Sequence, residues 1–592
     1  MRSVRWALAV TALLTLVMLS ATGLFAQNPR NPGIFKQWTA PPSSTLAYFA
    51  SEAGKQALLH SSNPAARGIL ARFHPDAVGQ YPQQPLVHAD LASEIHPPVS
   101  VTGCGTASGT VMNLEAAANA VAQRGPSVDF LLSELGSGKD LVVESGYDSR
   151  LGSFDSYSGI YVHRDPSQSC YGGTDFEMGN YTIANPFDPS DMLIGMGGAR
   201  VLADANSSHK QFIFADLRAD GEAAGVGLRR VPASNFENTS TCPAGTLTFG
   251  QEATCQGATA ILVDPSVYEM ADSVSIAQDP RSSGTGAGDI YVVNTQFGSF
   301  GSVIHLTACK ATFSSISDCA PTITVSGSQN QTQFPSVAVI AGGSNAGTIV
   351  ISYGYSPNNV EFVSCTPHGA PTHPTCGSHH LVRSDTNVIS TYFSLADNPG
   401  LALNTWPVIA ARTDSGGGQT IFIVWADCKV PTYSGYPVEG CIDADIVMAV
   451  DTSLSSPSFA FHHVSTSSGH QIMPAIAYDT GQNIVTIAYY STKSDAYKNK
   501  VVMEMNQIAS GSITVGSTVD VTTSYDSIAG DGTNTDSFDS NPMGDFTGLA
   551  AHGGSGAGSS RVYLGFTNNA RMGTYTGISN TQADNNVSRV TY

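Results

Sequence analysis

Two short runs decide the fold: Pro335-Ser-Val-Ala-Val-Ile-Ala341 and, after a turn rich in Gly, Ser and Asn, Ile349-Val-Ile-Ser-Tyr353. β-Branched residues dominate both runs, and turn-forming residues separate them, which predicts two neighbouring β-strands. Runs of the first kind recur 63 to 74 residues apart along the chain. They begin at Pro126, Gly198, Asp272, Pro335, Pro407, Pro474 and Gly544. Repeats of this period indicate a repetitive architecture.

Each first run is followed by a second apolar strand, such as Ile421-Phe-Ile-Val-Trp425, and then by two further strand-like stretches. The unit is therefore a four-stranded antiparallel meander. Seven such units arranged about an axis predict an all-β, seven-bladed β-propeller, with six or eight blades as alternatives. The first run of each unit is apolar on both faces, as expected for the innermost strand of a blade.

Composition agrees with this architecture. The 592-residue chain has only 12% charged residues but 59 Gly and 31 Pro, which excludes coiled coils, helical solenoids and charge-rich disorder. Its net charge of −20 and its lack of basic runs argue against nucleic acid and anionic membranes as partners.

The N-terminus resembles a secretory signal. Arg2 and Arg5 precede an apolar stretch, and cleavage is expected after Ala26, so residues 1–26 are predicted to be a signal peptide of a secreted, periplasmic or cell-surface protein. An uncleaved membrane anchor is the alternative. Residues 27–100 are predicted to form an extension, with a helix over 45–60, and residues 101–592 the propeller. Whether the extension is a removable pro-segment stays open.

The ten cysteines agree with export. They are Cys104, Cys170, Cys242, Cys255, Cys309, Cys319, Cys365, Cys376, Cys428 and Cys441. The last eight form neighbouring pairs, which predicts four local disulfides, and elimination leaves Cys104 with Cys170. A zinc site made of Cys365, His368, His373 and Cys376 is the alternative at one pair.

The final unit is short, with only 49 residues from Gly544 to the end. The chain before the first blade, around Val99 to Met112, is therefore predicted to supply the outermost strand of the last blade. This pairing would cover an open sheet edge.

The run Gly544-Asp-Phe-Thr-Gly-Leu-Ala550 and the Pro-x-Ile-Ala starts resemble secreted bacterial sialidase-like propellers of the BNR type. Such enzymes carry Ser-x-Asp-x-Gly-x-Thr-Trp boxes. Here Thr413-Asp-Ser-Gly-Gly-Gly-Gln-Thr420 is a degenerate version, and no Phe-Arg-Ile-Pro motif occurs. The family's catalytic residues therefore cannot be carried over.

In an antiparallel blade, the start of the first strand and the end of the second lie at the same end of the ring. Polar residues at these places are expected to meet on one rim of the central channel and to bind a ligand. They are Asp148, Arg150, Asp216, Arg218, Trp425, Asp427 and Asp545. Arginines there could hold a carboxylate, and the aromatic could stack on a sugar ring. The alternative is that each Asp-x-Arg is a local ion pair.

Two functions follow as hypotheses. The first is a secreted, monomeric propeller that binds a glycan or an extracellular protein on this rim, with no membrane span and no cofactor. The second is an exo-acting glycoside hydrolase of sialidase type, for which Arg150, Arg218 and Arg412 could supply cations. Calcium is a further alternative at the acidic loop containing Asp531, Asp536 and Asp539, although its spacing differs from an EF-hand.

Overall fold

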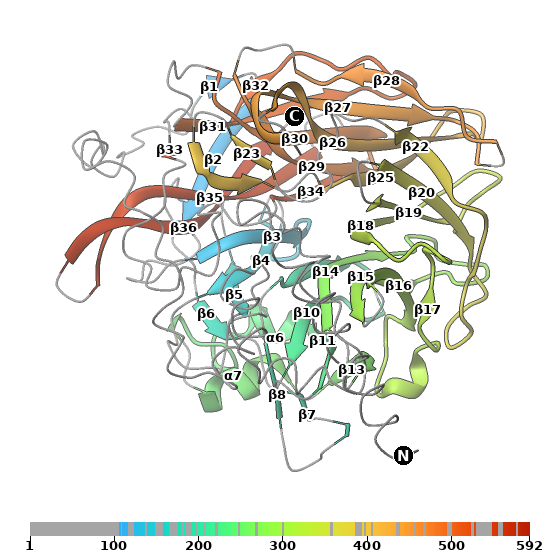
Figure 1. The fold of residues 1–592 in the computed structure, drawn as a ribbon. Coiled ribbons are helices and arrows are strands. Elements are labelled where there is room, and N and C mark those ends of the chain that lie inside the picture. The colour runs from blue at the N-terminus through green and yellow to red at the C-terminus, as the bar shows by residue number, and fades with distance from the viewer. Residues whose placement is uncertain are drawn as a thin grey trace, which may run out of the picture.

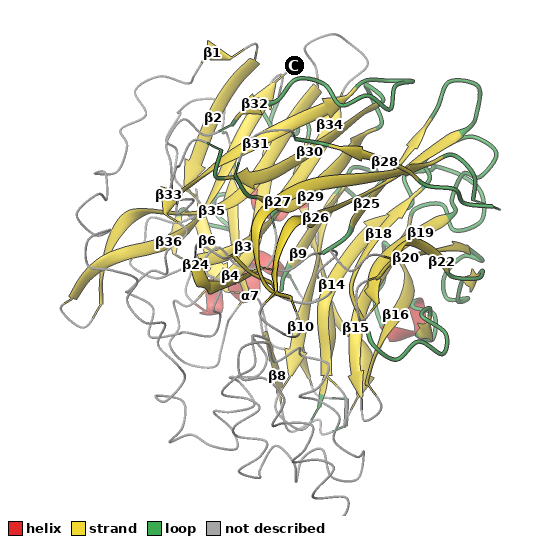
Figure 2. Ribbon diagram, turned by 45° about the horizontal axis from the view of Figure 1, so that its top comes forward, coloured by secondary structure: helices red, strands yellow, loops and turns green. Residues whose placement is uncertain are grey.

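The computed structural model shows seven four-stranded antiparallel blades arranged in a ring, a β-propeller, as predicted (Figures 1 and 2). It describes residues 106–591 with internal gaps, of which the longer are 116–122, 149–157, 165–175, 385–392, 494–499, 528–546 and 554–559. The predicted signal peptide, extension and helix over 45–60 lie outside the described residues.

The two inner strands of every blade follow the predicted runs. The innermost strands of blades 1 to 7 are β3 (Gln123–Leu131), β9 (Arg200–Asp204), β14 (Met270–Gln278), β18 (Thr332–Val339), β25 (Val408–Thr413), β29 (Gln471–Asp479) and β34 (Gly548–Gly553). The second strands are β4 (Leu141–Asp148), β10 (Gln211–Ala219), β15 (Asp289–Gly298), β19 (Ile349–Tyr355), β26 (Gln419–Tyr433), β30 (Ile484–Ser491) and β35 (Ser560–Tyr575).

The outer half of each blade continues the meander. The third strands are β5 (Ser158–His163), β11 (Ala224–Pro232), β16 (Gly301–Lys310), β20 (Asn359–Thr366), β27 (Val438–Asp451), β31 (Lys500–Ile508) and β36 (Ile578–Thr591). The outer strands are β6 (Phe176–Gly179), β13 (Ala260–Ser266), β17 (Ile323–Thr324), β21 (Thr375–Cys376), β22 (His380–Ser384), β28 (Ala460–His463), β32 (Val519–Asp520), β33 (Asp526–Ser527) and β2 (Gly109–Glu115).

Several short elements lie outside the four-stranded meanders. They are the strands β1 (Thr106–Ala107), β7 (Ile183–Ala184), β8 (Met192–Gly195), β12 (Gly245–Thr246), β23 (Phe393–Leu395) and β24 (Asn398–Leu403), the helices α6 (Ala233–Glu237) and α7 (Phe249–Gln256), and the 3₁₀ turn η4 (Ile316–Asp318). None of the helices in the described part of the chain is long and apolar enough to cross a membrane.

The ring closes as predicted, because chain from before blade 1 completes blade 7. Strand β2 pairs antiparallel with β36, with Val111 opposite Val590 and Leu114 opposite Val587. Figure 1 shows β2 in blue beside the red β35 and β36. The strand lies slightly later in the chain than predicted and ends at Glu115.

The core consists of the interfaces between blades, and strand alternation explains it. In β26, Ile421, Ile423 and Trp425 belong to the apolar cluster shared with blade 4. The alternate residues Phe422 and Val424 belong to the cluster shared with blade 6. Because successive side chains point to opposite faces, an apolar run without alternation serves two interfaces at once.

A recurring hydrogen bond also joins neighbouring blades around the channel. A serine hydroxyl on one innermost strand accepts the backbone N–H of a residue on the next innermost strand. The pairs are Ser127 with Val201 (3.2 Å), Ser275 with Val337 (3.4 Å) and Ser336 with Ile409 (3.2 Å). The hydroxyls thus satisfy amides that the blade's own ladder leaves unpaired.

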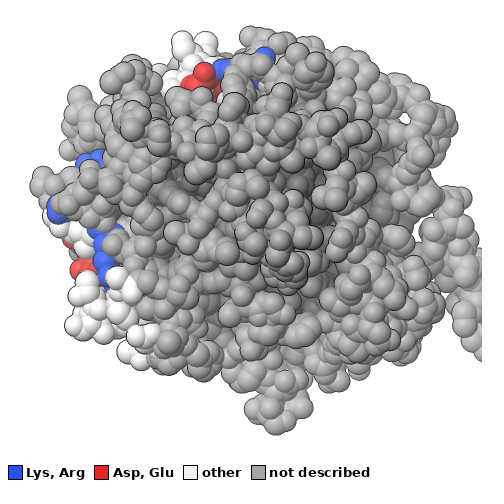
Figure 3. Space-filling model, turned by 90° about the vertical axis from the view of Figure 1, so that its left-hand side faces the viewer, with Lys and Arg blue, Asp and Glu red and all other residues white. Residues whose placement is uncertain are grey.

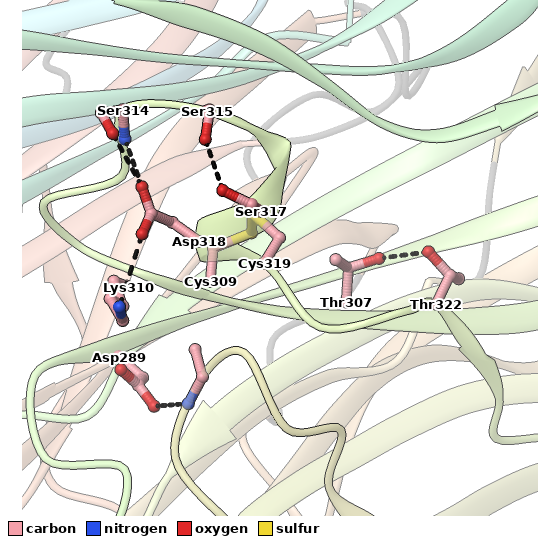
Figure 4. Close-up of a disulfide and its surroundings, with 11 residues drawn as sticks. Asp289, Thr307, Cys309, Lys310, Ser314, Ser315, Ser317, Asp318, Cys319 and Thr322 are labelled. Carbon is pink, nitrogen blue, oxygen red and sulfur yellow. Dashed lines mark hydrogen bonds and ion pairs between the residues drawn. A yellow bond between two sulfur atoms is a disulfide. The ribbon is translucent and has the colours of Figure 1, made fainter.

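Three of the predicted disulfides are confirmed: Cys242 with Cys255, Cys309 with Cys319, and Cys365 with Cys376. Figure 4 shows the second of these beside Asp318, which accepts hydrogen bonds from the backbone and hydroxyl of Ser314. The side chains of the other four cysteines lie outside the described residues, so their pairing stays a prediction.

The disulfide between Cys365 and Cys376 decides against the zinc alternative, because both sulfurs are already bonded. His368 Nε2 lies 2.8 Å from the Thr375 hydroxyl. In the described part of the chain, no group of three or more His, Cys, Asp or Glu side chains is arranged to hold a metal ion.

Candidate functional site: the central channel

The seven innermost strands enclose a channel with a volume of about 730 Å³. All seven contribute to its wall, as expected from the packing of the blades. The end at which these strands begin is called the Trp406 end, and the end at which they finish is called the His552 end. The volume falls in the range typical of small-molecule sites.

The backbone at the Trp406 end is strained in a repeated way. Three non-glycine residues there have positive φ angles: Ser273 (55°), Phe334 (57°) and Met473 (53°). Each lies within a register shift between the first and second strands of its blade, the mark of a β-bulge. Such strain costs of order 1–3 kcal/mol per residue and gathers at functional sites. The repetition shows that this end of the channel has one defined backbone shape.

An arginine and a tryptophan meet at this end. Arg200 is the first residue of β9 in blade 2, and its Nε donates to the backbone oxygen of Val274 in blade 3 at 3.0 Å. Its guanidinium carbon lies 5.2 Å from the ring centre of Trp406 in blade 5. The indole N–H donates to the Pro335 oxygen at 3.2 Å, and the ring of Phe334 packs against it. Arg200 therefore reaches past blade 3 to blade 5, and its planar cation is held against an aromatic face.

A histidine and an aspartate meet nearer the other end. His552 Nε2 lies 2.7 Å from Asp129 Oδ1, and its ring packs against Phe130. Partial desolvation lowers the pKa of His552, whose side chain is 43% exposed, but the negative charges of Asp129, Asp479 and Asp140 outweigh it and raise the pKa above the usual 6.5. The protonated imidazole is thus favoured beside these carboxylates.

Two further described carboxylates at the His552 end are paired locally. Asp204 contacts His209 Nδ1 at 2.8 Å and accepts a hydrogen bond from Gln211 Nε2 at 3.0 Å. Asp279 accepts two bonds from Arg281 Nε, at 2.9 and 3.0 Å. These carboxylates fix the hairpins that end the innermost strands.

The structure places Asp216 and Arg218 together, as a buried pair within strand β10. Arg218 Nε donates to Asp216 Oδ1 at 2.9 Å, and each residue is 2% exposed. A Cβ at Gly227 would lie 2.8 Å from both groups, so the pair fits because that position is glycine. Burial raises the pKa of Asp216, while the charges of Arg218 and Arg229 act in the opposite direction. The pair lies between blades 1 and 2, and its role in ligand recognition stays a prediction.

Trp425 and Asp427 lie together on another face, between blades 4 and 5. Trp425 is 0% exposed and packs edge-on to Phe461. Asp427 lies 3.3 Å from the Arg383 guanidinium. The structure therefore separates this group from the Asp216–Arg218 pair, and it encloses both groups in blade interfaces. Asp148 ends β4, and its side chain, like Arg150 and Asp545, lies outside the described residues.

Two of the arginines considered for a hydrolase also lie apart. Arg218 is held by Asp216 between blades 1 and 2. Arg412 donates to Asp414 at 2.9 Å and to the backbone oxygens of Ala509 and Ser512 at 3.0 and 2.7 Å, which join blade 5 to blade 6. These two cations serve different interfaces and do not converge in one pocket.

Arg200, Trp406 and His552 were not among the site residues predicted from the sequence. A signal for the first two was present, because Arg200 occupies the position at which other repeats carry Ser127, Ser275 and Ser336. Trp406 directly precedes one of the predicted starts, at Pro407. A comparison of the repeats position by position would have marked Arg200 as a charged residue at a position where those three repeats carry serine.

No known family model matches the chain, and no curated protein matches it. Among solved structures, similarity was found to a neuraminidase-like protein of A/flat-faced bat/Peru, at 8% identity and a TM-score of 0.31, covering 81% of this chain and 90% of that one. An exo-beta-1,3-galactanase from Phanerochaete chrysosporium is 11% identical, with a TM-score of 0.29 and coverages of 82% and 99%. An alpha-L-arabinofuranosidase from Fusarium graminearum is 10% identical, with a TM-score of 0.30 and coverages of 54% and 92%. Likenesses of this size assign no activity to this chain.

Proposed function

We propose that this protein is a secreted propeller of sialidase-like type that binds a carbohydrate at the Trp406 end of its central channel. The observation that carries the proposal is the stack of Arg200 on Trp406 at the wall of a channel of about 730 Å³. Planar cations and aromatic rings are the groups that recognise a ligand with apolar faces and polar edges. Sugars are ligands of this kind.

The wall of the channel supports the proposal. Serine hydroxyls from three blades, at Ser127, Ser275 and Ser336, line it together with aliphatic side chains. The Asp129–His552 pair adds a carboxylate and an imidazole farther along. Polar groups placed among apolar side chains are the groups with which a small-ligand site orients its ligand.

The strained bulges also support the proposal that the ligand binds at the Trp406 end of the channel. Phe334 has a φ of 57° and packs against Trp406, with ring centres 5.2 Å apart. The bulge therefore helps to hold the indole in place before a ligand arrives. A preformed site loses less conformational entropy on binding.

Residues that the sequence predicted on the channel rim are also part of this proposal, as groups that surround the Arg200–Trp406 site. Asp216 and Arg218 lie toward the Trp406 end of blade 2, because β10 runs antiparallel to β9 and extends beyond its start. We propose that they support the rim, and that Asp148, Arg150 and Asp545 extend it. Calcium in the loop of Asp531, Asp536 and Asp539 stays a prediction.

The test is a glycan array, with a peptide array in parallel, probed with the parent protein and with Arg200→Ala. Loss of the guanidinium should weaken binding of a glycan by about tenfold or more, the usual effect of deleting a charge-assisted hydrogen bond. Arg230→Ala is the matched control, because Arg230 Nε also donates to a backbone oxygen of the next blade, at Phe313, and its guanidinium also lies over an aromatic ring.

The control should bind glycans like the parent. If Arg200→Ala binds every glycan as tightly as the parent does, the channel is not the site. If the parent binds only peptides, the ligand class is wrong.

A further inference from the structure

The central channel has a polar group near each end, and both groups line one cavity. Arg200 and Trp406 line it at one end, and Asp129 and His552 line it nearer the other. The innermost strands set the distance between them, because a strand of five residues, such as β9, is about 16 Å long. A single monosaccharide is too short to contact both groups, whereas a chain of several sugar residues is not.

The stretch of channel between the two ends has small and aliphatic side chains. Alanines of blades 3 to 7 contribute to its wall: Ala277, Ala338, Ala410, Ala477 and Ala550. Because an alanine side chain ends at Cβ, it leaves space that a larger side chain would fill. Leu202 and Ile276 add aliphatic surface. This stretch suits the apolar faces of sugar rings and has room for a chain to continue.

At the Trp406 end, three serine hydroxyls are held as hydrogen-bond donors. The Oγ atoms of Ser127, Ser275 and Ser336 each accept an N–H from the next blade, which fixes their positions. All three serines line the channel, and no acceptor among the described residues takes their protons. A hydroxyl whose oxygen already accepts an N–H still has its own proton to donate. Together with Arg200, these hydroxyls offer donors to the oxygens of one sugar residue.

Nearer the other end, His552 is held in place with one nitrogen to spare. Its Nε2 lies 2.7 Å from Asp129 Oδ1, and Asp129 is fixed by N–H groups of Phe130 at 2.8 Å and of Ala203 at 2.7 Å. The Nδ1 of His552 makes no hydrogen bond to a described residue, although the side chain lines the channel. The neighbouring carboxylates raise the pKa of His552, which favours a proton on both nitrogens. His552 therefore offers a donor to a second sugar residue.

Charge differs between the two ends of the channel wall. At the Trp406 end, the described wall carries one charged side chain, Arg200. At the His552 end it carries three carboxylates and two basic groups: Asp129, Asp204, Asp279, Arg281 and His552. On the outer side of the molecule in Figure 3, by contrast, described basic (blue) and acidic (red) side chains lie together at the edges of the view. The carboxylates at the His552 end disfavour a negatively charged sugar there and leave a neutral one unaffected.

We propose that the channel holds a linear oligosaccharide along its length, with one terminal residue at Arg200 and Trp406 and a neutral residue at His552. The proposal rests on the proposed function, since it takes the Trp406 end to be a sugar site, and it adds the length, the form and the charge of the chain. All seven innermost strands contribute to the wall, so a branch in the middle of the chain would meet a strand on any side. His552 is then a residue that determines specificity for chain length.

The first experiment is calorimetry of the full chain with linear cello-, xylo- and malto-oligosaccharides of one to five residues, using the series that binds best on the glycan array. Affinity should rise by tenfold or more from one residue to the length that reaches His552. His552→Gln should remove about tenfold of the affinity for the longer chains, the usual effect of losing a hydrogen bond to a charged group, and leave the monosaccharide unchanged. Arg200→Ala should weaken every length alike.

A second measurement uses the parent protein, so it does not depend on the folding of a variant. Diethyl pyrocarbonate labels accessible histidines, and mass spectrometry of peptides gives the rate at each one. A saturating chain of several residues should slow the labelling of His552 by about fivefold or more, while the saturating monosaccharide should not. The control is His463, an exposed histidine of β28 on the outer side of blade 5, whose labelling should stay constant with either sugar.

The outcomes separate this proposal from the proposed function. Equal affinity for one residue and for longer chains, or unchanged labelling of His552 with a long chain bound, would overturn the spanning chain and leave a sugar site at Arg200 intact. Oligogalacturonates of matched length, which carry a carboxylate on every residue, should bind at least tenfold less tightly than the neutral chain, and equal binding would overturn the neutral residue at His552. Absence of binding by every glycan would refute the proposed function and the spanning chain together.

Discussion

Glu361 should make the whole protein less stable as pH rises, and Glu361→Gln should remove that effect. Glu361 is 5% exposed in β20, directly opposite Tyr353 of β19. Burial raises its pKa from 4.5 to about 7, although a hydrogen bond with Gln329 acts in the opposite direction. The folded protein therefore keeps a proton that the unfolded chain releases above pH 4.5.

The magnitude follows from the size of this shift. One pKa unit corresponds to 1.36 kcal/mol, so a rise from 4.5 to about 7 costs about 3 kcal/mol once both states are fully ionised. A raised carboxyl pKa means that the cost is absent below pH 4.5, grows between pH 4.5 and 7, and is constant above that range. Glutamine has the same shape and carries no charge, so the variant should gain about 3 kcal/mol on the parent between pH 4 and 8.

The assay is urea unfolding, followed by circular dichroism at several pH values from 4 to 8. The quantity compared is the difference in unfolding free energy between variant and parent, because the other titratable groups contribute equally to both. Asp318→Asn is the control. Hydrogen bonds from Ser314 lower the pKa of Asp318 to about 2, so the difference in unfolding free energy between Asp318→Asn and the parent should be constant above pH 5. A difference for Glu361→Gln that stays within about 0.5 kcal/mol across the range would refute the reasoning.

Three further outcomes are expected. Replacing Cys309 and Cys319 with serine should cost about 3 kcal/mol in urea unfolding, from the entropy of closing a short loop, and an unchanged midpoint would show that the disulfide adds nothing. Ser336→Ala should cost about 1 kcal/mol because the Ile409 amide loses its acceptor, whereas Ser317→Ala, an exposed serine of η4, should cost less than about 0.5 kcal/mol in the same assay. Deleting residues 97–113 removes most of β2 and should lower the melting temperature measured by calorimetry, and an unaltered melting curve would contradict ring closure by this strand.

The fold was predictable because it depends on local patterns. The run from Pro335 to Ala341 and its six counterparts gave the number and order of the blades, and the short last unit predicted the pairing of β2 with β36. Local cysteine spacing predicted the three observed disulfides. Each of these inferences needed only residues near one another in the chain or a count of strands.

The candidate site was less predictable because it joins residues far apart in the sequence. Arg200 and Trp406 come from blades 2 and 5, and their meeting depends on the direction of one long side chain across the channel. The burial of Asp216 and Arg218 was also not predictable from strand ends: Gly227 leaves room for the pair to lie inside a blade interface, and its role in ligand recognition stays a prediction. The order and direction of the strands predict at which end of the ring a residue lies, but they do not predict which way its side chain points.

The most direct test of the channel as a binding site uses Trp406 as its own reporter. The chain has four tryptophans, and Trp425 is the only other one within 101–592, so Trp425→Phe makes emission from this region specific to Trp406. Titration with the glycan that binds best on the array should shift this emission along a saturable curve. Adding Arg200→Ala should weaken the midpoint about tenfold or more, and adding Arg230→Ala should not. A glycan that binds by calorimetry with no change in Trp406 emission, and equally well without Arg200, would contradict a site at the Trp406 end of the channel.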